Sequence, residues 1–157
     1  MAGIAQERLQ EELKVWKYNH PTNFSARPAA GLDGSTNLFH WICSVPGKPG
    51  TVWEDGCYTV TLLFTPQYPT VPPKCRFEPT VFHPNVFPSG TIALSLLDCD
   101  QDWRPYVTVK DVLLGIQTLL DEPCLDNPAN AEAYMVFTQS KDAYEEVVRR
   151  GADLNRI

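Results

Sequence analysis

Apolar residues recur at helical spacing near the start of the chain. Ala5, Leu9, Leu13 and Trp16 follow one another at steps of four, four and three residues. This period predicts an amphipathic helix that ends before Pro21. We expect its apolar stripe to pack on a sheet and the charged positions between to stay in solvent. These positions are Glu7, Arg8, Glu11, Glu12, Lys14 and Lys17.

The next part of the chain has the short alternating pattern of strands. Tyr58, Val60, Leu62 and Phe64 alternate with Cys, Thr and Leu residues, and turn residues separate this run from its neighbours. Because turns rather than helices join the runs, we expect an antiparallel meander. The predicted strands are 24–29, 38–45, 57–64 and 75–78.

Seven prolines mark residues 65–90, a stretch that also carries several large apolar side chains. Each proline fixes φ and removes an amide donor, so this stretch cannot form a central strand, apart from the short predicted strand 75–78. Linkers are polar, whereas this stretch is not. We therefore predict a shaped, functional loop.

Helical spacing returns after residue 107. Thr108 is a suitable N-cap for a helix that Pro123 ends. The pair 127–128, Asn followed by Pro, predicts the cap and first turn of another helix. Ser140 begins a last helix, with Gly151 after it. One helix, four strands and then helices predict a single α+β domain over residues 1–157.

Composition narrows the function classes. The chain has 157 residues and a formal charge of -6, from 13 Lys and Arg against 19 Asp and Glu. This balance argues against nucleic-acid binding by phosphate neutralisation and against an anionic membrane surface. No apolar run is long enough for a membrane span, and the first residues lack a signal-peptide pattern. We expect a monomer of the nucleus and cytoplasm.

The five cysteines are odd in number and widely spaced, so they predict neither a disulfide framework nor a zinc site. His40 and Cys43 lie three residues apart without a second pair of ligands, which makes a weak case for a metal. We expect reduced thiols, mostly buried, and no metal. The cysteines are Cys43, Cys57, Cys75, Cys99 and Cys124.

Three segments, in their order and spacing, resemble the ubiquitin-conjugating enzyme family: 68–73 (YPTVPP), 83–97 (HPNVFPSGTIALSLL) and 103–105 (WRP). The resemblance implies the fold of that family and a thioester relay without a cofactor, in which a carrier cysteine passes a modifier to a substrate lysine. It also implies a SUMO-like modifier, its activating enzyme, ligases and substrate proteins as partners. The segments most similar to the SUMO-conjugating members are 46–50, 53–56, 98–102 and 132–134.

Ala93 stands where the family has its nucleophilic cysteine. A methyl group is neither a nucleophile nor a leaving group, so we expect the chain as written to be inactive. Two origins stay open: a deliberate Cys→Ala replacement, or a natural non-catalytic scaffold that binds modifier or ligase. Two carboxylates beside Cys99 disfavour it as a substitute, and we rank Cys124 lower still.

The resemblance carries three more catalytic positions onto this chain. Asn85 matches the amide thought to support the oxyanion, although a structural role is equally compatible with the family. Asn127 and Phe87 stand where the SUMO carrier has an aspartate and a tyrosine that help to orient the incoming lysine. Asn127 keeps an acceptor oxygen without the charge, and it is also the predicted helix cap.

Recognition of a short acceptor motif is implied as well. The positions for the acidic side are Lys74, Ser89 and Thr91, of which Lys74 is favoured by its charge, although a solvated loop lysine is the alternative. The positions for the apolar side are Pro128, Ala129 and Ala131. Lys14, Lys17 and His20 match basic positions of the partner-binding first helix. Leu13 stands where the family has another basic residue, so electrostatic steering of an acidic modifier toward this helix is expected to be weaker.

Overall fold

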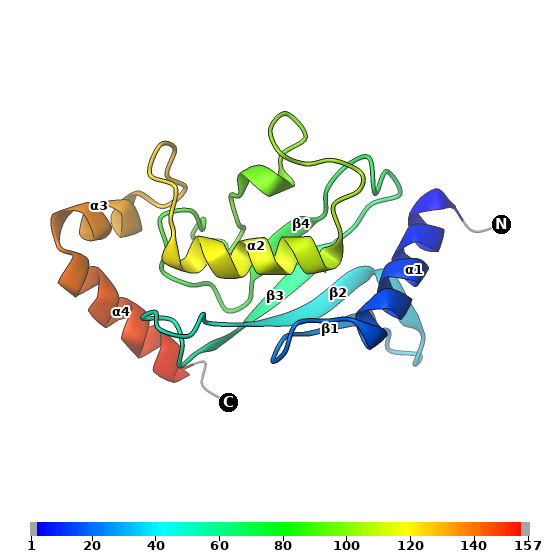
Figure 1. The fold of residues 1–157 in the computed structure, drawn as a ribbon, viewed down its shortest axis with the longest axis horizontal. Helices are drawn as coiled ribbons and strands as arrows, with labels where there is room; N and C mark the ends of the chain where they lie inside the picture. The colour runs from blue at the N-terminus through cyan, green and yellow to red at the C-terminus, as the bar shows by residue number, and fades with distance from the viewer. Residues whose placement is uncertain (1–2, 155–157) are drawn as a thin grey trace.

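The computed structural model describes residues 3–154. Helix α1 precedes four strands, a short 3-10 helix η1 follows them, and three helices end the described chain (Figure 1). The bounds are α1 Ile4–Tyr18, β1 Ser25–Ala30, β2 Thr36–Pro46, β3 Cys57–Leu63, β4 Lys74–Phe77, η1 Ser95–Leu97, α2 Val109–Asp121, α3 Ala131–Gln139 and α4 Lys141–Leu154.

The four strands form one antiparallel sheet in the order β1-β2-β3-β4. Cys43 pairs with Val60, and Val60 pairs with Phe77, so one row of inward side chains crosses three strands. All three are buried. The alternation seen in the sequence therefore fixes which face of the sheet meets the core.

Helix α2 lies across the sheet, α1 stands at one end of it, and α3 and α4 lie at the other end (Figure 1). The apolar stripe of α2 is fully buried, as its spacing predicts. Thr108 caps α2: the Asp111 N–H donates to Thr108 Oγ1 at 3.1 Å, and the Thr108 N–H donates to Asp111 Oδ2 at 3.0 Å.

The predicted fold is confirmed as an N-terminal helix, a four-stranded antiparallel sheet and C-terminal helices. Three local predictions are wrong. Asn130, not Asn127, caps α3, because its side chain accepts the Ala133 N–H at 3.0 Å. Helix α4 continues through Gly151 to Leu154, and Ala152 after the glycine is buried at 2% exposure. Glu12 is buried rather than solvated.

The cysteines are all free, but only Cys43 and Cys75 are buried. Burial raises the pKa of the Cys43 thiol to about 12, so it is inert near neutral pH. Cys99 and Cys124 are exposed, which corrects the expectation of mostly buried thiols. Within residues 3–154, no helix combines the length and apolar character that a membrane crossing needs.

Candidate functional site

An open groove of about 530 Å³ lies between the 85–101 segment and the end of α2. Ala93 lines this groove and is half-buried, so its methyl group is accessible from solvent. Asn85 and Asn127 line it as well, as does Cys124. The other lining residues are Ile92, Leu94, Ser95, Leu97, Asp98, Gln101, Leu119 and Asp126.

His83 anchors the loop that forms one wall of this groove. It is fully buried, and its Nε2–H donates to the carbonyl oxygen of Leu119, near the C-terminal end of α2, at 2.7 Å. Its Nδ1 accepts the Asn85 N–H at 2.9 Å, which fixes the neutral tautomer. Burial lowers the pKa of His83 to about 4, so the ring stays neutral near pH 7.

Asn85 ties two sides of the groove together. Its backbone carbonyl accepts the Ala93 N–H at 2.8 Å. Its side-chain Nδ2 donates to the Cys124 carbonyl at 2.7 Å, and its Oδ1 accepts the Cys124 N–H at 2.8 Å. This pair of bonds gives Asn85 a structural role. One Nδ2–H is left without a hydrogen bond among the described residues.

A tight turn joins the loop to Ala93. The Gly90 N–H donates to the Phe87 carbonyl at 2.8 Å, and the Phe87 N–H donates to the Thr91 carbonyl at 2.9 Å. Gly90 has φ +95° and lies against the Phe77 carbonyl, where a side chain would clash. Phe87 is 44% exposed on this turn and is not among the groove-lining residues.

The predicted acidic-side residues lie on the strand edge beside the turn. An isolated bridge pairs Arg76 with Thr91, and the Ile92 N–H donates to the Cys75 carbonyl at 2.9 Å. Lys74 begins the same strand and is exposed. Ser89 Oγ and Thr91 Oγ1 are 3.0 Å apart. The structure thus brings Lys74, Ser89 and Thr91 to the segment that leads into Ala93.

The predicted apolar-side residues follow the groove in sequence but do not line it. Pro128 and Ala131 are exposed, and Ala129 is half-buried. The amides of Ala129 and Asn130 both donate to the Pro84 carbonyl, at 2.8 and 3.1 Å. These two bonds hold the start of α3 against the loop of His83 and Asn85.

The predicted partner-binding residues lie at the end of α1. Lys14 and Lys17 are exposed on the helix. His20 follows the helix, stacks on Trp16 with ring centroids 5.3 Å apart, and its Nδ1 lies 2.8 Å from the Trp16 carbonyl. This contact fixes the imidazole against the helix end.

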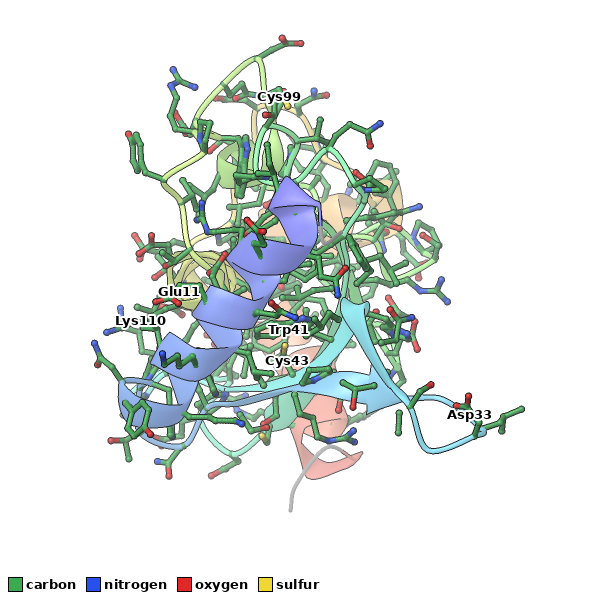
Figure 2. The ribbon with its side chains drawn as sticks, turned by 90° about the vertical axis from the view of Figure 1, so that its right-hand side faces the viewer. Glu11, Asp33, Trp41, Cys43, Cys99 and Lys110 are labelled. Carbon is green, nitrogen blue, oxygen red and sulfur yellow. The ribbon has the colours of Figure 1, made fainter. Side chains whose placement is uncertain are left out.

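Cys124 is the groove residue that sequence reasoning missed. Sequence reasoning ranked Cys99 above it, but Cys99 lies on the loop after η1, at the top of Figure 2, and does not line the groove. Its Sγ lies 3.9 Å from the Thr70 carbonyl instead. No pattern near Cys124 signals its position in the groove, where the side chain of Asn85, 39 residues earlier, bonds its backbone.

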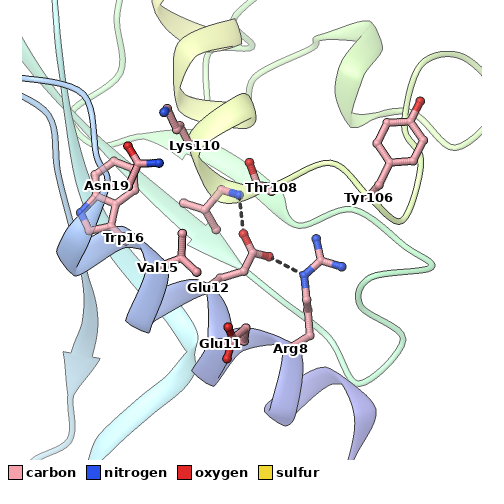
Figure 3. Close-up of a pocket in the computed structure, with 10 residues that line it drawn as sticks. Arg8, Glu11, Glu12, Val15, Trp16, Asn19, Tyr106, Thr108 and Lys110 are labelled. Atoms are coloured by element: carbon pink, nitrogen blue, oxygen red, sulfur yellow. Dashed lines mark hydrogen bonds and ion pairs between the residues drawn. The ribbon is translucent and has the colours of Figure 1, made fainter.

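A second groove, of about 410 Å³, lies between α1 and the start of α2 (Figure 3). Glu12 forms its floor: Oε1 accepts the Val109 N–H at 2.6 Å, and Oε2 accepts from Arg8 Nε at 3.1 Å and from the Tyr68 hydroxyl. Burial, and then the Glu12 carboxylate, raise the pKa of Tyr68. Tyr68 therefore stays protonated and donates.

Comparison with known proteins identifies the family. Residues 8–152 match the family model described as ubiquitin-conjugating enzyme. The chain is 49% identical over 152 residues to SUMO-conjugating enzyme UBC9 of Caenorhabditis elegans, covering 97% of this chain and 92% of the relative.

Two further relatives agree with it. The Sumo-conjugating enzyme ubc9 of Dictyostelium discoideum is 50% identical over 95% of this chain and 94% of the relative. SUMO-conjugating enzyme SCE1 of Arabidopsis thaliana is 49% identical over 94% and 92%. The chain therefore belongs to the ubiquitin-conjugating enzyme family of transferases, on the branch of the SUMO-conjugating enzymes.

Proposed function

We propose that this chain is a SUMO carrier whose nucleophilic sulfur atom is missing at position 93. The observation that carries the proposal is the place of Ala93. It lies in an open groove, its amide is bonded to Asn85, and Asn127 lines the same groove. A cysteine at this position would receive the modifier's C-terminal carboxyl as a thioester, and a substrate lysine would then attack it.

Ala93 makes the chain as written unable to use this position. We attribute the residue to replacement of a cysteine, because the wall around Ala93 is well ordered: the Ala93 amide is bonded to the Asn85 carbonyl, and the Asn85 side chain is bonded to Cys124. The gene's codon for residue 93 tests this attribution. A cysteine codon agrees with replacement, and an alanine codon makes the chain a natural scaffold that holds modifier or ligase without chemistry at this position.

The proposal includes the handling of the acceptor. Asn127 supplies an amide oxygen to the groove but no charge, and Phe87 supplies an apolar ring without a hydroxyl. Lys74 is exposed beside the turn and suits the carboxylate of an acidic residue near the acceptor lysine. The partners are SUMO, its activating enzyme, SUMO ligases and substrate proteins. The carrier acts as a monomer in the nucleus and cytoplasm, where its five free thiols stay reduced.

Loading of the restored chain tests the proposal. Ala93→Cys is incubated with activating enzyme, SUMO and ATP, and a non-reducing gel is expected to show an adduct that thiol reductant removes. Ala93→Ser is the matched control, because a hydroxyl forms an ester that reductant does not cleave. Absence of a reductant-sensitive adduct on Ala93→Cys would contradict the proposal.

The first helix supplies an independent test of the partners. Lys14→Glu with Lys17→Glu reverses two exposed charges on α1, so binding of modifier or activating enzyme should weaken by about tenfold at low salt. The control is Lys48→Glu with Lys141→Glu, which makes the same change of charge at exposed positions outside α1. Equal affinity of the two double variants, measured by titration calorimetry, would exclude this face.

A further inference from the structure

We infer that the Asp126 carboxylate binds the side-chain nitrogen of the acceptor lysine and directs it toward the thioester at position 93. The inference rests on the proposed function, because it needs a carrier that is loaded at position 93. It deepens that function by assigning one charged side chain of the groove to the acceptor.

Two of the side chains that line the groove are charged, and both are carboxylates. Asp98 comes directly after η1, and Asp126 lies in the segment between α2 and α3. The other lining residues, Ala93 and Asn127 among them, are neutral. A lysine side chain is an ammonium ion near neutral pH, so the charge of this groove favours its approach from solvent.

Asp98 already uses its carboxylate to hold its own loop. Oδ1 accepts the Asp100 N–H at 2.8 Å, and Oδ2 accepts from Gln101 Nε2 at 2.9 Å. The bond from the Asp100 backbone, and then the bond from Gln101, lower the pKa of Asp98. A lysine that approached Asp98 would have to share both oxygens with these donors. Asp98 therefore serves mainly to order the wall of the groove.

Asp126 lines the same groove with its carboxylate uncommitted. The side chain is exposed, and neither of its oxygens accepts a hydrogen bond or an ion pair from any residue in the range 3–154. The full charge and all the acceptor capacity of this carboxylate are thus available to a ligand in the groove. Of the two carboxylates, Asp126 is the one that can bind an ammonium group without breaking a bond of the fold.

The backbone on both sides of Asp126 is tied to the loop that holds Ala93. Before it, the Cys124 N–H and carbonyl are bonded to the Asn85 side chain at 2.8 and 2.7 Å. After it, the Ala129 N–H donates to the carbonyl of Pro84, the residue before Asn85, at 2.8 Å. The carbonyl of Asn85 in turn accepts the Ala93 N–H at 2.8 Å. Asp126 therefore lies on a short span with both ends fixed to one wall of the reaction site.

A carboxylate at this place acts on the atom that reacts. The lysine ammonium gives one proton to water before it attacks, and its nitrogen becomes positive again as the carbon–nitrogen bond forms. A carboxylate oxygen that accepts an N–H of this nitrogen orients it and stabilises the returning positive charge. The carbon–sulfur bond then breaks, and the extra proton on nitrogen passes to the released thiolate, which leaves an amide and a thiol.

Discharge of the loaded carrier to two different nucleophiles tests the inference. Ala93→Cys is loaded with SUMO, ATP is removed, and loss of the thioester is followed with N-acetyl-lysine amide or with hydroxylamine, which is uncharged above neutral pH. Adding Asp126→Asn should lower the second-order rate constant for the lysine compound by about tenfold at low salt and leave that for hydroxylamine unchanged. Asp126→Glu keeps the charge and should retain most of the lysine rate.

Asp100→Asn is the matched control, because it removes one exposed carboxylate outside the groove and should leave both rates unchanged. Two results would overturn the inference: Asp126→Asn discharges to the lysine compound as fast as the restored carrier does, or it is slowed equally toward both nucleophiles. Failure of Ala93→Cys to load is a different result, seen before any nucleophile is added, and it would overturn the proposed function together with this inference.

Discussion

The two ends of α2 are each held by a buried polar side chain from a distant part of the sequence, but by different chemistry. At the N-terminal end, the Val109 N–H donates to the Glu12 carboxylate, which is paired with Arg8. At the C-terminal end, the Leu119 carbonyl accepts from the neutral His83 ring. Backbone groups that the helix itself cannot satisfy are thus satisfied by charge at one end and by a neutral donor at the other.

The difference shows which end serves the reactive groove. Arg8 also donates to the carbonyls of Pro105 and Val107, so the charged end fastens α1 to the segment before α2. The contacts of His83 continue through Asn85 to both Ala93 and Cys124. The N-terminal end therefore holds the fold, and the C-terminal end shapes the wall where the thioester would form.

The largest expected effect is loss of the charged anchor. Glu12→Ala leaves Arg8, the Tyr68 hydroxyl and the Val109 N–H without their acceptor. Removing one partner of a buried ion pair is expected to lower the free energy of unfolding by about 3 kcal/mol. Glu11→Ala removes an exposed carboxylate from the same helix and should cost less than about 0.5 kcal/mol. Equal urea midpoints for the two variants would refute the role given to Glu12.

The neutral anchor predicts a dependence on pH. The pKa of His83 is about 4 in the folded chain against 6.5 ordinarily, so the unfolded chain binds a proton first as the pH falls. The contribution of neutral His83 to the free energy of unfolding is therefore fully present above about pH 6.5. It is lost as the pH falls from 6.5 to 4, by about 3 kcal/mol in total.

His83→Gln isolates this contribution, because Gln keeps a donor for the Leu119 carbonyl but does not titrate. We expect the unfolding free energy of the variant to fall less over this pH range than that of the unmodified chain, as measured by urea titrations at several pH values. Parallel curves for the two proteins would mean that His83 does not cause the loss.

The smallest effect is expected at the cap of α2. Thr108→Ala removes the acceptor of the Asp111 N–H and should lower the free energy of unfolding by about 1 kcal/mol. Thr118→Ala is the control, since Thr118 is exposed on the last turn of the same helix and its side chain caps nothing among the described residues. If Thr118→Ala lowers the free energy of unfolding as much as Thr108→Ala does, the Thr108 cap adds little to the stability that Glu12 gives this end of α2.

Local sequence patterns predicted the helices and strands well, because spacing, alternation and capping depend on residues that are close in sequence. The spacing of Leu9 and Trp16, the alternation in β3 and the cap at Thr108 all reappear in the structure. Glu12 was misplaced because a charge within a helical pattern looks solvated, and only Val109, 97 residues later, supplies its buried donor. Helix α4 likewise continues through Gly151 to Leu154, and Ala152 after the glycine is buried.

The same reason limits what the sequence says about the site. The resemblance located Ala93 and Asn85 because they share one continuous segment. The cap at Asn130 was missed because the Pro84 carbonyl draws the amides of Ala129 and Asn130 inward, which leaves Asn127 on the groove. The place of Cys124 on the groove was not predicted, because the Asn85 side chain bonds its backbone through space. Tertiary hydrogen bonds, rather than propensities, determine these three positions.

Single-turnover discharge of the restored carrier tests the central claim most directly. Ala93→Cys is loaded with SUMO, the activating enzyme is stopped by removing ATP, and free lysine is added. The thioester is expected to disappear at a rate that rises with lysine concentration, with a SUMO–lysine amide as the product. A chain that fails to load, or a thioester that decays only by hydrolysis whatever the lysine concentration, would contradict the claim that a sulfur atom at position 93 makes this groove a working carrier.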